Sequence, residues 1–148
     1  MEALLTAIVV WLSANYNLPA SFEHPRIEFA SAEDISSRLY ESIAREQHAA
    51  IVLNQPELDV VSLYSNEAKT IYLLDGWKGR TPGELSMVVH EMVHHLQNVG
   101  QLKFACPQER EKLAYSAQND WLALFGSDLT REFQLDPFSV LVKTNCFY

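Results

Sequence analysis

Apolar residues recur with a helical period in the N-terminal part of the chain. In residues 1–12 they lie on one face, at positions 4, 5, 8, 9 and 12, which predicts a packed amphipathic helix. Residues 17–25 have the composition of a loop. Ser31 offers an N-cap three residues before Asp34, so we expect a second helix from there to about Gln47.

The clearest helix start lies at residues 81–84, which read Thr-Pro-Gly-Glu. Thr81 can cap the helix, Pro82 suits its first position, and Glu84 completes a capping box. Apolar residues then recur at helical spacing, and Gly100 is a suitable residue to end the helix. Residues 106–125 predict another helix, and residues 136–146 a last short element that is either helix or strand.

Extended segments are indicated at three places. Residues 26–30 alternate polar and apolar side chains, as a short strand does. Residues 59–64 and 70–74 are rich in β-branched and aromatic side chains and predict a β-hairpin. The apolar run at 51–53 is ambiguous. We therefore expect an α+β fold in one domain over residues 1–148, with a small mixed or antiparallel sheet packed on the helix that begins at Thr81.

Composition and charge exclude several classes of protein and of binding partner. The chain has 148 residues, of which 48% are apolar, and only 5 Gly and 6 Pro, so a disordered or collagen-like chain is excluded. With 11 basic and 19 acidic residues the formal charge is −8, which argues against nucleic-acid binding and against an anionic membrane surface. The apolar N-terminal segment is too short to span a bilayer, and Glu2 stands where a signal peptide is basic.

The two cysteines leave two interpretations open. Cys106 and Cys146 have no Cys or His at the spacing of a zinc finger. They are either two buried thiols of a cytosolic protein or one disulfide that ties the C-terminal segment to the chain before residue 107. The disulfide would favour a periplasmic or secreted protein over a cytoplasmic one.

The candidate chemistry lies in the helix that begins at Thr81, where residues 90–94 read His-Glu-Met-Val-His. Residues four apart share a helix face, so His90 and His94 can bind one metal ion. At 100° per residue the two histidines point away from the apolar stripe, to a face of their own. Glu91 lies one residue round the helix, placed to contact water at the metal rather than to bind the metal itself.

A third protein ligand is needed, because a catalytic zinc site commonly has three. His95 is turned by about 100° from His94 and cannot share its face. His24 and His48 are expected at the surface. Glu109 and Glu111 begin the following helix, which can return antiparallel beside the first. Glu109 suits the helix dipole alone, whereas Glu111 shares a polar face with Tyr115 and Gln118, so we favour Glu111.

This order of elements resembles the gluzincin type of zinc metallopeptidase in a minimal single-domain form. The segments LYSNEAKTIYLL, SMVVHEMVHHLQ and EKLAYSAQNDWL resemble small uncharacterised bacterial proteins of this kind. The resemblance implies a zincin-like fold and Zn²⁺ bound by His90, His94 and Glu111. It implies hydrolysis of a peptide or protein substrate by Glu91-assisted attack of a zinc-bound water. It also implies that the strand at 70–74 flanks the cleft and can pair with an extended peptide.

The donor that stabilises the oxyanion is left open by this resemblance. Gluzincins usually supply a Tyr or His, so Tyr115 and His95 are the candidates. The sequence also departs from larger gluzincins, which often have an acidic residue four positions after the ligand Glu, where this chain has Tyr115. Support for the ligands is therefore expected from elsewhere, with three candidates: Asp120, Gln118 and Asn119.

Two other functions compete with the peptidase. The same scaffold can bind zinc without cleaving and serve as a peptide or protein interaction domain, or the histidine pair can be incidental in an interaction module without metal. Glu91 favours the peptidase, because it has no role unless a water is activated. The acidic charge of the chain mildly favours a basic or neutral peptide over an acidic one.

Overall fold

The computed structural model of the protein describes residues 1–47 and 61–146. In these residues the chain forms six helices and one three-stranded sheet, an α+β arrangement as expected. The predicted run at 51–53, His48 and the start of the predicted strand at 59–64 lie outside the described residues. The elements are α1 Glu2–Tyr16, β1 Arg26–Ala30, α2 Ala32–Gln47, β2 Ser62–Ser65, β3 Thr70–Leu74, α3 Pro82–Val99, α4 Pro107–Ala123, α5 Leu129–Phe133 and α6 Pro137–Thr144.

The sheet is mixed and has the strand order β1-β3-β2. β2 and β3 form the predicted hairpin, antiparallel with Ser62 opposite Leu73, while β1 runs parallel to β3 with Arg26 opposite Thr70. β3 is thus the central strand, hydrogen-bonded on both sides. The expectation that residues 70–74 pair with a peptide is therefore wrong, because no edge of β3 is free. Among the described residues, β2 has a strand partner on one side only.

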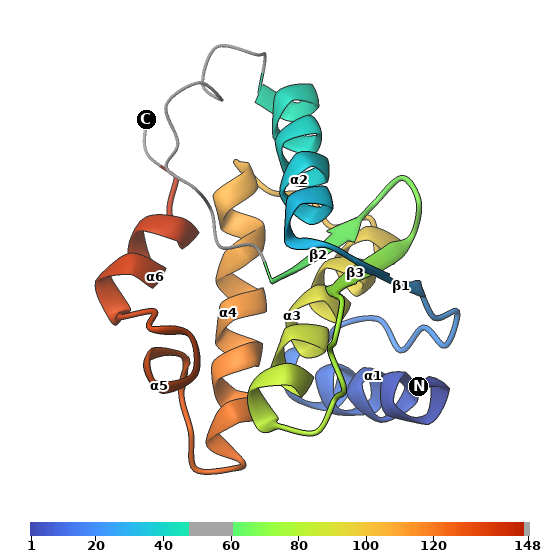
Figure 1. Ribbon diagram of the computed structural model, residues 1–148, viewed down its shortest axis with the longest axis vertical. Coiled ribbons are helices and arrows are strands. Elements are labelled where there is room, and N and C mark those ends of the chain that lie inside the picture. Colours follow the sequence, from blue (N-terminus) through green and yellow to red (C-terminus); the bar gives the residue numbers. More distant parts are fainter. Residues whose placement is uncertain (48–60, 147–148) are drawn as a thin grey trace.

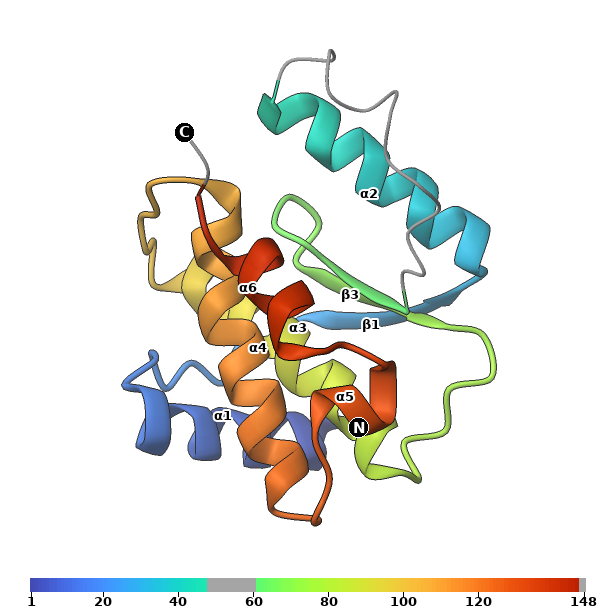
Figure 2. The same ribbon diagram turned by 90° about the vertical axis from the view of Figure 1, so that its left-hand side faces the viewer.

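The sheet separates α2 from the other helices. α2 contacts β2 and β3 on one side, and α3 packs against β2 on the other (Figure 1). α1 and α4 both pack on α3, and α5 and α6 pack against α4 (Figure 2). The main core lies where α1, the sheet, α3 and α4 meet, and the side chains of Ile8, Leu12, Ile71, Met92 and Leu96 are fully buried there.

α3 begins as its sequence predicts and is buried on almost every side. Thr81 Oγ1 accepts a hydrogen bond from the backbone N–H of Glu84, whose carboxylate accepts one from the N–H of Thr81. The face that carries His90 and His94 is separate from the apolar stripe but is not open, because α4 packs along it. The two helices therefore enclose the polar face of α3 between them.

Other helix ends differ from the predictions by a few residues. α1 continues beyond residue 12 to Tyr16, and α4 ends at Ala123 rather than near Phe125. The segment at 136–146 is a helix, α6, capped by Asp136. The short helix α5, capped by Asp128, was not predicted, because five residues are too few to show a period. None of the helices in the described ranges combines the length and the apolar character that crossing a bilayer requires.

A disulfide joins the start of α4 to the segment after α6. Cys106 and Cys146 are bonded, with their Cα atoms 5.9 Å apart and a sequence separation of 40. Of the two interpretations of the cysteines, the structure therefore has the bridged one. The bond fixes the N-terminal end of α4, the helix that carries Glu111.

Removing this disulfide is expected to destabilise the fold. A bridge closing a loop of this length restricts the unfolded chain, and chain entropy gives a loss of about 3–4 kcal/mol of unfolding free energy when it is removed. Urea unfolding of the Cys106→Ser/Cys146→Ser double variant measures the loss. The Cys146→Ser single variant is the control and should lose a similar amount, since either change removes the same bond. Unchanged unfolding in both variants would contradict a bridge in the native protein.

Candidate metal centre

Three side chains from α3 and α4 converge on one point. His90 and His94 lie one turn apart on α3, and Glu111 faces them from the second turn of α4. The Nε2 atom of His90 lies 3.0 Å from Glu111 Oε2, and the Nε2 atom of His94 lies 3.2 Å from Glu111 Oε1. The two Nε2 atoms are 3.3 Å apart. These residues form the group that could hold a metal ion in the described part of the chain.

A hydrogen-bond chain fixes the orientation of His90. The Ser86 hydroxyl donates to the carbonyl of Gly83 (2.7 Å) and therefore accepts from the amide N–H of Gln118 (3.2 Å). The amide oxygen of Gln118 then faces Nδ1 of His90, at 2.9 Å. Because that oxygen can only accept, Nδ1 of His90 carries a proton, so in the neutral ring the lone pair that can bind a metal ion or a second proton lies on Nε2.

His94 is oriented in the same way by a second glutamine. Gln97 donates its amide N–H to the backbone carbonyl of Arg110, at 3.1 Å, so its amide oxygen faces Nδ1 of His94, at 3.0 Å. Nδ1 of His94 is therefore protonated, and its Nε2 also keeps a lone pair. Gln97 is 2% exposed, so water does not compete with this arrangement.

The resulting geometry fits a tetrahedral cation. Two lone pairs 3.3 Å apart repel each other unless a positive charge lies between them. A tetrahedral metal with bonds of about 2.0–2.1 Å holds its ligand atoms about 3.3 Å apart. The spacings of 3.0, 3.2 and 3.3 Å between the Glu111 oxygens and the two Nε2 atoms are close to this value. The donor set of two imidazoles and one carboxylate suits zinc and similar ions.

The charges in this group are strongly coupled. Burial would raise the pKa of Glu111, but when Nε2 of the histidines binds a proton in place of a metal ion, the positive charge of His94 and hydrogen bonds from both rings hold that pKa well below its usual range. Burial would lower the pKa of His90, yet the hydrogen bond and charge of Glu111 raise it. The Glu111 carboxylate is thus kept ionised, the form that binds a cation.

Glu91 lies beside this group and is 5% exposed. Its Oε1 atom accepts a hydrogen bond of 2.7 Å from the hydroxyl of Ser62, the first residue of β2. Its negative charge acts on both His90 and Tyr115. Because Ser62 occupies only one carboxylate oxygen, the other oxygen can accept a proton or a hydrogen bond.

Tyr115 lies at the same site, one turn after Glu111 on α4. Its ring meets the ring of His90 edge to face, with centroids 4.7 Å apart. Burial, followed by the carboxylates of Glu111 and Glu91, raises the pKa of Tyr115, so its hydroxyl stays protonated. Among the described residues that hydroxyl has no hydrogen-bond partner, which leaves it available as a donor.

His95 is bonded to β2 and to the loop before β1, and it does not join the metal group. Its Nε2 donates to the carbonyl of Glu23 at 2.8 Å, and its Nδ1 accepts from the hydroxyl of Tyr64 at 3.1 Å. Burial lowers the pKa of His95, in keeping with a neutral ring. Since both ring nitrogens are bonded and the side chain is 1% exposed, we withdraw His95 as a candidate oxyanion donor.

The remaining candidates have structural roles. Glu109 Oε2 accepts from the backbone N–H of Ala105, a contact that caps the start of α4. His24 is partly buried rather than exposed and pairs with the hydroxyl of Thr6. Asp120 accepts a hydrogen bond from Tyr16, and Asn119 accepts one from the N–H of Leu129. Of the three residues expected to support the metal-binding side chains, Gln118 is therefore the one that contacts such a side chain, that of His90.

Sequence reasoning missed Gln97 and Ser62. Gln97 could have been found, because it lies three residues after His94 on the same helix and residues at this spacing are neighbours. Ser62 contacts Glu91 across 29 positions of sequence. That contact depends on how the hairpin packs on α3, and no local pattern indicates it.

The fold and the site together define a small α+β protein with a candidate His-His-Glu metal centre between two helices. Comparison with protein families gives a match over nearly the whole chain. Residues 1–147 match the family described as a domain of unknown function, DUF6647, and the chain belongs to that family. No match was found among curated proteins or among solved structures.

Proposed function

We propose that this chain is a zinc-dependent metallopeptidase with a zincin-like fold, of the gluzincin type. The observation that carries the proposal is the convergence of two imidazole lone pairs and an ionised carboxylate, with Glu91 next to them. Two buried glutamines hold both rings in the tautomer that can bind a metal. A histidine pair without a ligand would not require such support.

His90, His94 and Glu111 would hold the zinc ion. Zinc, when bound, supplies a Lewis acid that polarises a carbonyl group and makes water more acidic. Glu91 is the proton acceptor in this proposal, because Ser62 orients its carboxylate and leaves one oxygen available. The same carboxyl group then returns the proton to the leaving amine.

Tyr115 is the remaining candidate for the oxyanion donor. Its phenol is protonated, packs against the ring of His90 and lies within the electrostatic reach of Glu111 and Glu91. A hydroxyl in this place can donate a hydrogen bond to the oxygen of a peptide carbonyl as negative charge develops there. With His95 bonded elsewhere, Tyr115 takes this role alone in the proposal.

The number of protein ligands favours a catalytic site over a structural one. In the described ranges the group has three members, His90, His94 and Glu111. Structural zinc sites are usually closed by four protein ligands, whereas catalytic sites have three and an open position. This observation favours the peptidase over a zinc-binding domain that does not cleave.

The disulfide bears on where the protein works. Disulfides persist in oxidising compartments and are rare in the cytosol. The bond between Cys106 and Cys146 therefore supports a periplasmic or secreted location, which we include in the proposal.

Metal removal is expected to stop peptide hydrolysis reversibly. Purified protein incubated with a pool of quenched fluorescent peptides should release fluorescence, because the proposed site has an open position for substrate. Treatment with 1,10-phenanthroline should reduce the rate to background, and added zinc should restore it. Hydrolysis that continues after complete removal of metal would contradict the proposal.

A further inference from the structure

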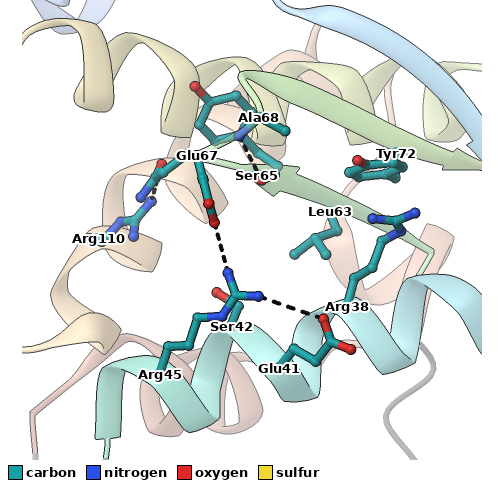
Figure 3. A pocket seen from close by; sticks show the side chains of 12 residues that line it. Arg38, Glu41, Ser42, Arg45, Leu63, Ser65, Glu67, Ala68, Tyr72 and Arg110 are labelled. Carbon is teal, nitrogen blue, oxygen red and sulfur yellow. Dashed lines mark hydrogen bonds and ion pairs between the residues drawn. The ribbon is translucent and has the colours of Figure 1, made fainter.

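A pocket lined by several arginines lies between α2 and the β2–β3 hairpin, on the face of the sheet opposite α3. Its volume is about 530 Å³, within the usual range of ligand pockets. Figure 3 shows Arg38, Glu41 and Arg45 extending from α2, with the hairpin opposite them and Arg110 of α4 at one end. The pocket is thus built from three separate elements.

The charge of this lining differs from that of the whole chain. Three arginines, Arg38, Arg45 and Arg110, and two glutamates, Glu41 and Glu67, line the pocket. Among the described residues the lining therefore carries one more positive than negative charge, whereas the whole chain has 19 acidic against 11 basic residues. A local excess of arginine in an acidic protein attracts anionic groups to that place.

Arg38 is the arginine best able to bind a ligand. Its guanidinium lies over the ring of Tyr72, 4.4 Å from the centroid, as Figure 3 shows. Within the described part of the chain no carboxylate lies at ion-pair distance from it. Stacking on an aromatic ring holds the planar fork of an arginine in place and leaves its N–H groups free to bind a carboxylate.

Arg45 is paired, but its partners are exposed. It contacts Glu67 at 2.8 Å and Glu41 at 3.9 Å, and the three side chains are 66–82% exposed. Exposed pairs of this kind contribute little, at most about 1 kcal/mol each. A ligand carboxylate can therefore replace one of these partners at small cost.

Two elements, β2 and α4, contribute residues both to the pocket and to the surroundings of the metal centre. On β2, Ser62 contacts Glu91 on the face of the sheet toward α3, and the next residue, Leu63, lines the pocket on the opposite face, toward α2. On α4, Arg110 lines the pocket and the next residue, Glu111, belongs to the metal group. Among the described residues one edge of β2 has no strand partner, so an extended peptide along that edge would present alternate side chains to the two faces of the sheet, and a side chain near the cleaved bond can enter the pocket.

We propose that this pocket selects substrates with an acidic side chain, which Arg38 and Arg45 bind a few residues from the cleaved bond. This inference rests on the proposed peptidase function and specifies its substrate class. It reverses the expectation from net charge, which favoured basic or neutral peptides, because the local lining rather than the distant surface contacts the side chain.

Two matched pools of quenched fluorescent peptides test the inference. Each pool has one fixed position, occupied by Glu in the first pool and by Gln in the second, and the fixed position is moved along the peptide. The wild type should cleave the Glu pool about five- to tenfold faster at one position, as expected for a partly exposed charged hydrogen bond. The Arg38→Gln variant should cleave the two pools at equal rates. Arg80→Gln removes the same charge outside the pocket and should keep it.

The outcomes separate the two proposals. Cleavage without preference for Glu at any position, or a preference that survives in Arg38→Gln, would overturn the pocket assignment and leave the peptidase intact. If no pool is cleaved, the peptidase proposal fails. Fluorescence anisotropy with zinc-loaded protein then measures whether the pocket binds Glu peptides more tightly than Gln peptides. Tighter binding of Glu peptides that is lost in Arg38→Gln would support the pocket assignment, and equal binding of both pools would overturn it.

Discussion

Replacing Glu91 with Gln is expected to abolish peptide hydrolysis while leaving the metal in place. Gln has the size of Glu and can still accept the hydrogen bond from Ser62, but it cannot take a proton from water. A general base contributes about 10²–10⁴-fold to the rate, so kcat should fall by about a thousandfold. The measurement is the cleavage rate of a peptide that the wild type hydrolyses.

Metal content and fold are the controls for this variant. Glu91 is not a member of the His-His-Glu group, so zinc per chain and the unfolding temperature should match those of the wild type. Ser62→Ala is a milder companion, since it removes the orienting hydroxyl and leaves the base, and a smaller decrease is expected. Hydrolysis at the wild-type rate in Glu91→Gln would show that another residue accepts the proton.

Replacing Glu111 with Gln is expected to remove most of the stabilisation that metal gives to the fold. A ligand that binds only the folded state stabilises it by about 4 kcal/mol when its free concentration is about a thousand times Kd. Glu111 supplies the one charged ligand, and it joins α4 to α3. Thermal unfolding with and without EDTA should therefore show a large shift for the wild type and almost none for Glu111→Gln.

Glu109 provides a matched control on the same helix. Glu109→Gln makes the same chemical change two residues away, where the carboxylate caps the backbone of Ala105 rather than facing the histidines. This variant should lose some stability from the cap but keep the full response to EDTA. An equal response in Glu111→Gln and Glu109→Gln would contradict the assignment of Glu111.

Features of the chain with local causes were predictable. The capping box at Thr81 and Glu84 places the start of α3, and the spacing of His90 and His94 places both rings on one helix face. Glu111 could be preferred over Glu109 because it shares a face with Tyr115 and Gln118, and the structure brings Glu111 to the histidines. In each case the prediction depends on residues that lie at most seven positions apart in the sequence.

Features that depend on contacts between distant segments were not predictable. The strand at 26–30 was expected, but its parallel pairing with β3 makes β3 central and leaves β1 and β2 as the edge strands among the described residues. His95 could have faced the site or the opposite side until Glu23 and Tyr64 were placed beside it. The pocket forms where α2 packs against the hairpin, so its arginines come from distant parts of the sequence. The composition of the chain therefore does not indicate the charge of the pocket.

Elemental analysis of the purified protein shows whether His90, His94 and Glu111 bind zinc. The wild type, prepared with zinc in the growth medium and dialysed without chelator, is expected to contain about one zinc ion per chain. Glu111→Gln prepared in the same way should contain far less. A wild type without bound metal, or equal zinc contents in the two proteins, would show that these three residues are not a zinc site.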